Sequence, residues 1–292
     1  MYKIQYIIFK IFRSILLLLP EKLRFKMAET LGNIGYRVIK KRRLIALANL
    51  KLAFPNKSNK EIEKIAKESY RIMAKSFLST LWFDDYLKTK VNLMDFQRVL
   101  RAKDKGKGVA IALIHMGNME ATLKAAENCE VVTVAKKQRN PYIDKFITDA
   151  REKLNIILLK KSKQTSRELR EKLEEKCVLA LFSDHRDKGA NVVFFGEETV
   201  SPTGIVNTAL KYDMPLIIGY NIMNKDNTCT TYFTEELDLV RTGSFKHDVM
   251  ENTQLLMNNI EHIITNYPDQ WMWFHDRWKL YKKIIKEKNG RK

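Results

Sequence analysis

The chain has 292 residues, of which 45% are hydrophobic and 30% are charged. This is an ordinary globular mixture with enough apolar residues for a core, and the absence of low-complexity stretches and internal repeats excludes a repeat protein. The three cysteines (Cys129, Cys177 and Cys229) show no CxxC spacing. Their odd number fits a reducing compartment and argues against a disulfide framework or a zinc site.

The formal net charge of +19 is concentrated at the two ends of the chain. Residues 1–60 contain 14 Lys and Arg against Glu21 and Glu29, a surplus of 12. Residues 275–292 contain eight against Asp276 and Glu287, a surplus of six. Basic ends around a nearly neutral body predict docking onto an anionic surface, which is a lipid headgroup layer, an acidic protein or a nucleic acid.

Residues 2–19 are strongly apolar but are interrupted by Lys3, Lys10 and Arg13. A charge near the middle of a bilayer costs about 2.5–3.5 kcal/mol, which favours a helix in the interface plane over a clean span. No small-residue cleavage site follows, which argues against a signal peptide. We therefore expect a membrane-anchoring or interfacial helix over residues 1–20, with the basic residues that follow on the cytoplasmic side. The alternative is a helix that packs its apolar face on the core.

Residues 21–90 predict a helical part of the protein. A helix from Lys41 to Phe54 ends at Pro55, and a second from Ser58 to Tyr86 begins with a capping-box pattern, Ser58-Asn-Lys-Glu61.

From residue 108 onward, short apolar runs alternate with amphipathic segments. Buried strands are predicted at Val109–Ile114, Val131–Ala135, Ile156–Leu159, Val178–Phe182 and Leu216–Asn221, with helices near 119–128, 140–154, 165–176 and 202–212. This alternation predicts an α/β fold with a largely parallel sheet flanked by helices. We expect an antiparallel edge strand at Thr228–Phe233 and helices near 246–266 and 276–288. Because no Pro/Gly-rich linker interrupts the chain, we predict one domain over residues 21–292.

The segment His115-Met-Gly-Asn-Met-Glu120 directly follows a predicted strand, so His115 projects from its carboxyl end, where open α/β sheets place reactive groups. A histidine oriented by a carboxylate is a general base, and the spacing allows Glu120 to return toward the imidazole. Asp184 also follows a strand and points into the same crevice. By itself the His-x4-Glu spacing is common by chance.

The surrounding segment GKGVAIALIHMGNMEA resembles the signature of the bacterial late acyltransferases of lipid A biosynthesis. Four more blocks are similar to that family in the same order: Arg43…Asn49-Leu…Phe54-Pro55, Asn140-Pro141…Arg151, Ser183-Asp184…Phe194-Phe195-Gly196…Thr203-Gly204, and Tyr267-Pro268…Trp271…His275-Asp-Arg277-Trp-Lys279. Two positions depart from the family pattern. Met119 stands where an aromatic residue is usual, and His185 stands where Gln usually follows the Asp.

The resemblance implies transfer of a fatty acyl group from acyl carrier protein, or another thioester donor such as acyl-CoA, to a hydroxyl of a lipid A precursor. It implies a protein of the bacterial inner membrane with its catalytic domain on the cytoplasmic side. It makes His115 the base, Glu120 its carboxylate partner, and Arg151 and Asp184 the oxyanion-binding or substrate-positioning residues. The candidate substrate-binding residues are Asn118, Phe195, Gly196, Arg277 and Lys279, the last two for phosphates. We expect no cofactor and no metal.

Three rival functions remain. The same chemistry on another membrane glycolipid, such as a phosphatidylinositol mannoside, would leave His115 and Glu120 unchanged. A nucleic-acid-binding protein would carry an aromatic-interleaved basic patch on the body of the fold, whereas the charge here is terminal. A metal-dependent hydrolase using His115, Glu120 and His185 lacks a recognised ligand spacing.

Overall fold

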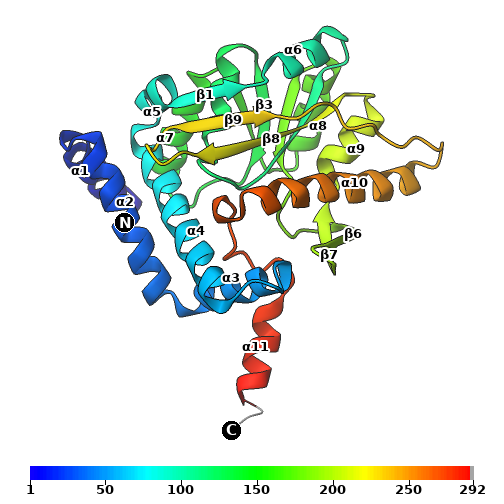
Figure 1. Cartoon of the computed structure of the whole chain (residues 1–292). Coiled ribbons are helices and arrows are strands. Elements are labelled where there is room, and N and C mark those ends of the chain that lie inside the picture. The colour runs from blue at the N-terminus through cyan, green and yellow to red at the C-terminus, as the bar shows by residue number, and fades with distance from the viewer. Residues whose placement is uncertain (290–292) are drawn as a thin grey trace.

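A seven-stranded sheet forms the centre of the protein in the computed structural model, which describes residues 1–289 (Figure 1). Across the sheet the strands are β1 (Val91–Met94), β9 (Cys229–Phe233), β8 (Leu216–Met223), β2 (Val109–Leu113), β5 (Val178–Phe182), β3 (Val131–Ala135) and β4 (Ile156–Lys160). The five from β8 to β4 are parallel, β9 is antiparallel to β8, and β1 is parallel to β9.

The central strand β2 is buried over its whole length, as an apolar strand in a covered parallel sheet should be. Its side chains alternate between two cores. Ala110 and Ala112 face the larger core, and Ile111 and Leu113 face a smaller one on the opposite side. Burial on both faces explains why this segment has no polar residue, and it places whatever follows the strand at the sheet's carboxyl edge.

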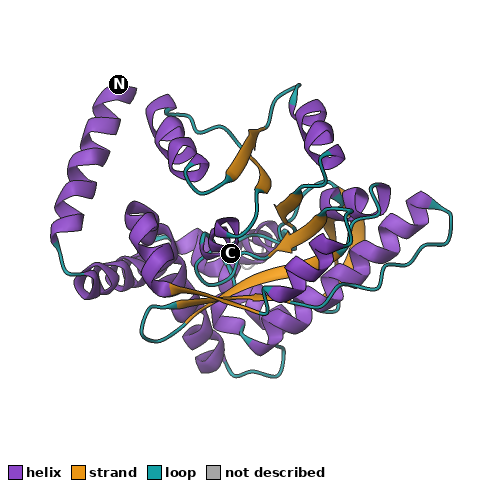
Figure 2. Ribbon diagram, turned by 90° about the horizontal axis from the view of Figure 1, so that it is seen from above, coloured by secondary structure: helices purple, strands orange, loops and turns teal. Residues whose placement is uncertain are grey.

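Helices cover both faces of this sheet (Figure 2). The larger core packs against α8 (Thr165–Glu174), α9 (Gly204–Lys211), α10 (Phe245–Asn266) and the amino-terminal helices α3 (Lys40–Ala53) and α4 (Asn59–Ser79). The smaller core packs against α6 (Gln97–Asp104) and the 3-10 segment η2 (Ala121–Glu127). The remaining elements are α7 (Pro141–Glu152), η1 (Thr80–Trp82), α5 (Phe83–Lys90), η3 (Pro268–Gln270) and α11 (Leu280–Asn289).

The amino-terminal helices α1 (Tyr2–Leu18) and α2 (Glu21–Val38) lie beside the sheet (Figure 1). One face of α1 packs on α7, where Tyr6 stacks on Tyr142 and Phe9 meets the edge of Phe146. The opposite face presents exposed Ile, Leu and Phe side chains. Among the described helices, none is long and apolar enough to cross a membrane.

The predicted α/β architecture with a largely parallel sheet is confirmed, and so is the capping box at Ser58. Several details differ, among them the predicted helix from Ser58 to Tyr86, which is divided into α4, η1 and α5. The strand β9 is antiparallel to β8 as expected but is not at the edge, because β1 pairs beyond it. The segment 119–128 forms a 3-10 segment instead of an α-helix. A two-stranded hairpin, β6 (Gly189–Phe194) and β7 (Glu197–Pro202), was not predicted. Residues 290–292 of the predicted domain lie outside the described residues.

Candidate active site

The carboxyl ends of the neighbouring strands β2 and β5 bring His115 and Asp184 together. Leu113 and Phe182 are partners in the register of these strands, and the Ser183 amide donates to the Leu113 carbonyl at 3.0 Å. His115 and Asp184 each follow that paired position by two residues, so their side chains meet beyond the sheet edge. The imidazole Nδ1 lies 2.6 Å from Asp184 Oδ1, and the His115 amide donates to Asp184 Oδ2 at 2.9 Å.

Asp184 is an almost fully buried carboxylate with three hydrogen-bond donors around it. The third is the indole of Trp271, whose Nε1 donates to Oδ2 at 2.7 Å. Burial alone would raise the pKa of Asp184, but the charge of His115 and the hydrogen bonds from His115 and Trp271 outweigh it and hold the pKa well below its usual value. Asp184 is therefore ionised at neutral pH and fixes the proton of the imidazole on Nδ1.

This arrangement has the geometry that a general base requires. With Nδ1 held by Asp184, the neutral imidazole carries its lone pair on Nε2, the atom that can accept a proton from a hydroxyl group. The ring is one-fifth exposed, so a substrate can reach it. Phe182 stacks on its face, with ring centroids 4.1 Å apart, and restricts its rotation.

Glu120 does not take the position that we expected beside His115. Its two carboxylate oxygens instead accept hydrogen bonds of 2.8 Å each from Nη2 of Arg151, in the last turn of α7. Glu120 lies at the start of η2, five residues beyond His115, and the 3-10 geometry carries it toward α7. The expected His115–Glu120 pair is thus replaced by two pairs, His115–Asp184 and Glu120–Arg151.

The loop between these two pairs is held by close backbone packing and by buried polar side chains. Gly117 has φ +54°, and a Cβ there would lie 2.4 Å from the Asn221 carbonyl oxygen, so no other residue fits. Asn118, which we expected to bind substrate, is buried. It donates to Ser79 at 3.0 Å, while Ser76 of α4 contacts its amide oxygen at 3.3 Å. Asn118 therefore shapes the loop and does not face a substrate.

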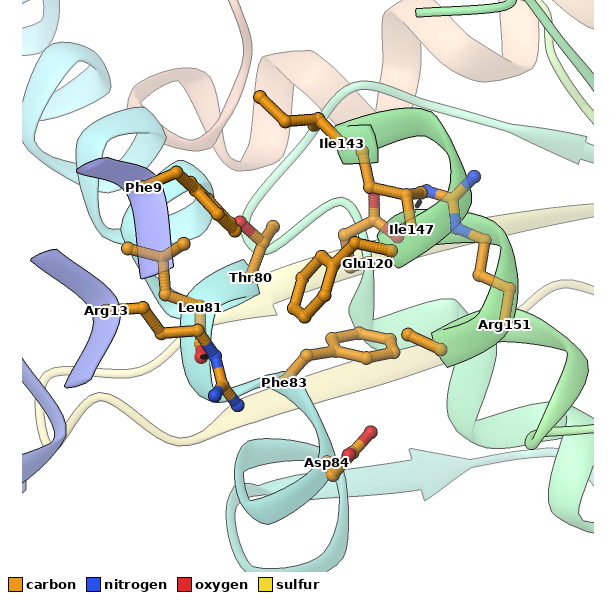
Figure 3. Close-up of a pocket in the computed structure, with 12 residues that line it drawn as sticks. Phe9, Arg13, Thr80, Leu81, Phe83, Asp84, Glu120, Ile143, Ile147 and Arg151 are labelled. Atoms are coloured by element: carbon orange, nitrogen blue, oxygen red, sulfur yellow. Dashed lines mark hydrogen bonds and ion pairs between the residues drawn. The ribbon is translucent and has the colours of Figure 1, made fainter. Parts of the chain in front are cut away.

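The Glu120–Arg151 pair lies at the boundary of two apolar cavities. The first, shown in Figure 3, has a volume of about 170 Å³ and is walled by α1, α5 and α7 through residues such as Phe9, Phe83 and Ile147. The second, about 50 Å³, is more enclosed and is lined by η2, β2, β3 and β5, including Phe182. Phe182, which stacks on His115, forms part of the lining of this second cavity.

Of the other predicted binding residues, Arg277 proves to be a core residue. Its side chain is 0% exposed and donates to the carbonyl of Val200 at 2.6 Å and to the hydroxyls of Thr199 and Ser201, all on β7. Its guanidinium stacks over Phe194 at 5.2 Å. Burial lowers the pKa of Arg277 to about 10. The guanidinium of Arg277 is therefore not accessible to the phosphate that we expected it to bind.

The remaining candidates are a hairpin turn and one surface lysine. Phe195 and Gly196, with φ of +53° and +74°, form the two-residue turn between β6 and β7, in the conformation of a type I′ hairpin. The Phe195 ring packs on Phe54 and Trp273 and thereby ties the hairpin to α3. Lys279 is exposed and adjoins α11. The structure therefore does not bring these three residues to His115 through any contact that it describes.

His115, Asp184 and His185 form a cluster whose potential metal-ligating atoms all lie within 4.8 Å of one another. Within this cluster Asp184 already accepts three hydrogen bonds, and the ring of His185 meets His115 edge to face at 6.0 Å. Burial lowers the pKa of His185 despite the nearby carboxylate, so it is neutral at pH 7. The cluster differs from the set of the hydrolase rival, in which Glu120 was the acid.

Trp271, which the sequence analysis names only as part of a family-like block, holds Asp184 through its indole N–H. Its carbonyl accepts a 2.5 Å hydrogen bond from Ser69, and its backbone bridges Met116, next to His115. The only signal for this role in the sequence is that Trp271 belongs to the C-terminal block that resembles the family. Asn49 helps to hold the segment that follows Trp271 in place, because its side-chain amide donates to the carbonyls of Trp273 and His275 at 2.8 and 2.7 Å.

Comparisons with known proteins identify the family of this chain. Residues 2–280 match the model of a family described as bacterial lipid A biosynthesis acyltransferase. The chain is 21% identical over 269 residues to a lipid A biosynthesis palmitoleoyltransferase of Escherichia coli strain K12, covering 89% of this chain and 86% of the relative. It is 22% identical over 281 residues to the lipid A biosynthesis lauroyltransferase of the same strain, covering 89% and 87%. A lipid A biosynthesis acyltransferase of Haemophilus influenzae is 21% identical over 273 residues, covering 90% and 83%.

The family match spans nearly the whole chain, from α1 to the start of α11, and includes both ion pairs of the site. The chain belongs to the bacterial lipid A biosynthesis acyltransferase family.

Proposed function

We propose that this protein transfers a fatty acyl chain from the thioester of acyl carrier protein to a hydroxyl group of a lipid A precursor. The observation that carries the proposal is the His115–Asp184–Trp271 chain of hydrogen bonds beside an enclosed apolar cavity. A base near an apolar cavity suits a reaction in which an acyl chain is held while a hydroxyl group is activated. Family membership supports the acyl transfer itself.

In the proposed mechanism, Nε2 of His115 takes the proton of the acceptor hydroxyl as its oxygen attacks the thioester carbonyl. The tetrahedral oxyanion then collapses, the C–S bond breaks, and the imidazolium returns the proton to the departing thiolate, which leaves an ester and a free thiol. Asp184 stabilises the imidazolium between these steps. No other reactant is needed for the balance.

The oxyanion requires a donor that is already in position. Arg151 is our candidate. In the contacts that the structure describes, Arg151 donates to Glu120 through Nη2 alone. A guanidinium has five N–H donors, so others are available for the oxyanion. Glu120 would then act as a positioning residue that holds Arg151 in place.

We further propose that the protein works at the cytoplasmic face of the bacterial inner membrane. The outward face of α1 carries Ile4, Ile8 and Ile15, each more than half exposed, beside the basic residues of the first 60 positions. An apolar helix face with basic surroundings suits an anionic lipid surface. The same positive charge suits an acidic carrier protein as the donor.

The test is an acceptor panel. Purified protein with acyl-loaded acyl carrier protein is offered a tetra-acylated lipid A precursor and, separately, a phosphatidylinositol mannoside. We expect acylation of the first, none with His115→Ala, and unchanged rates in chelator. Acylation of the second alone would transfer the proposal to that acceptor, and loss of activity in chelator would favour a metal-dependent reaction at His115, Asp184 and His185.

A further inference from the structure

A further apolar groove lies between α2, α4 and the segment that follows Trp271. It has a volume of about 400 Å³, and nearly all of its lining side chains are apolar, among them Leu31, Met73, Phe77 and Phe274. The side chains of Leu31 and Phe77 are half exposed. An exposed apolar patch of this kind is typical of a site that binds an apolar ligand or partner.

The floor of the groove is built by two glycines of α2 with different roles. At Gly32 an added Cβ would lie 2.8 Å from backbone atoms of α4, so this glycine lets the two helices pack backbone to backbone. At Gly35 an added Cβ would meet only the Tyr70 ring at 3.8 Å and Ile39 at 4.0 Å, which are ordinary contacts. Gly35 therefore leaves a space that helix packing does not require.

The inner end of the groove approaches the active site. Met73 belongs to a small apolar cluster against which Met119 and Met272 also pack, and Met119 directly precedes Glu120. His275, which lines the groove, is the fourth residue after Trp271, the indole that holds Asp184. A chain lying in the groove would thus end near the loop that carries His115 and Glu120.

The groove also has a cationic side chain in its lining. Arg42 lines it and donates to the Phe274 carbonyl at 3.1 Å through one nitrogen, which leaves further N–H donors for a ligand. Residues 30–60 contain eight Lys and Arg and no Asp or Glu. An apolar groove with an arginine in its lining matches a lipid that has hydrocarbon chains and an anionic headgroup.

We infer that this groove binds a hydrocarbon chain of the anionic acceptor lipid, with Arg42 at its headgroup, while the acyl chain of the donor lies on the side of the Glu120–Arg151 pair, where the two apolar cavities adjoin. The inference rests on the proposed acyl transfer, because only a reaction between two acylated substrates needs two apolar sites that converge on one base.

The test fills the space at Gly35. Phe has a higher helix propensity than Gly, so Gly35→Phe should keep the fold, which circular dichroism and thermal melting would check. The matched control is Ile34→Phe, one residue earlier on α2, exposed and outside the groove. The probe is a phosphatidic acid with a photoreactive diazirine in one chain, presented in detergent micelles, and the labelled residues are located by mass spectrometry.

We expect labels on groove residues such as Met73 and Phe274, at least a fivefold loss of these labels in Gly35→Phe, and no loss in Ile34→Phe. A diacylglycerol with the same photoreactive chain should label about tenfold less, and Arg42→Gln should abolish that difference. Equal labelling in the two Phe variants, or labels confined to the exposed face of α1, would overturn the inference.

A kinetic measurement separates this inference from the proposed function. With a tetra-acylated lipid A precursor, Gly35→Phe should raise the acceptor KM about tenfold and leave the donor KM unchanged. Labelling needs no turnover, so a protein that is labelled in the groove but transfers no acyl group would refute the proposed function alone. Transfer with an unchanged acceptor KM in Gly35→Phe would refute the groove alone.

Discussion

The substitution Asp184→Asn should disable the base while it preserves the shape of the site. The carboxylate now accepts three hydrogen bonds: from Nδ1 of His115 on one oxygen, and from the His115 amide and the Trp271 indole on the other. An Asn that keeps its oxygen toward the latter two donors must turn its NH2 group toward Nδ1. The opposite orientation would place two pairs of donors face to face, so the first is favoured.

That orientation reverses the tautomer of the imidazole. With Nδ1 forced to accept, the proton sits on Nε2, and the ring cannot take a proton from the acceptor hydroxyl. The equivalent change in a serine-protease triad lowers kcat about 10⁴-fold, which corresponds to about 5.5 kcal/mol, and we expect a loss of similar size here.

The assay is kcat for acyl transfer, measured for Asp184→Asn, Glu120→Gln and a matched control. The control is Asp187→Asn, the same change three residues further along at an exposed carboxylate whose loss should alter kcat by less than about twofold. Glu120→Gln should cost about tenfold, because its amide oxygen still accepts from Arg151. A 10⁴-fold loss in Glu120→Gln with a mild effect in Asp184→Asn would refute the pairing and restore Glu120 as the partner of the base.

Three further predictions concern stability and the membrane. Arg277→Ala should lower the free energy of unfolding by roughly 1–3 kcal/mol through unpaired acceptors on β7, measured by denaturant titration, and should leave the acceptor KM unchanged; a raised KM with normal stability would revive a phosphate-binding role. Burial lowers the pKa of His185 below 6.5, so below that pH the unfolded chain binds a proton more readily than the folded chain, and the free energy of unfolding falls. His185→Gln should lessen this fall between pH 7 and 5.5, and an equal fall in both proteins would contradict this. Ile8→Asp combined with Ile15→Asp should weaken sedimentation with anionic vesicles at least about 100-fold, because burying the two Ile side chains is worth about 3–6 kcal/mol together. Unchanged sedimentation would exclude the α1 face as the main contact.

The parallel sheet could be predicted because its strands are buried on both faces and therefore appear as continuous apolar runs. The edge strand β1 (Val91–Met94) escaped prediction since it has four residues and only Val91 is buried. The hairpin does carry a signal, the alternating burial of Ala190, Val192 and Phe194, but its turn is Phe195-Gly196 instead of the common Asn-Gly.

The site was predicted in its members but not in its pairing. His115 and Glu120 were joined because they are close in sequence, whereas Asp184 is 69 residues away from His115. The information needed was the register of two adjacent parallel strands, Leu113 with Phe182, which only the assembled sheet supplies. Arg277 was misassigned for a similar reason. A basic residue in a basic tail looks exposed, until the hairpin that buries it is known.

The most direct test of the account is the mass of the lipid product. The protein is incubated with a tetra-acylated lipid A precursor and acyl carrier protein loaded with one defined fatty acid, and the lipid is then analysed by mass spectrometry. We predict a gain of one acyl group in place of one hydrogen, absent with His115→Ala. An unchanged precursor with the wild-type protein, or an equal gain with His115→Ala, would contradict the account.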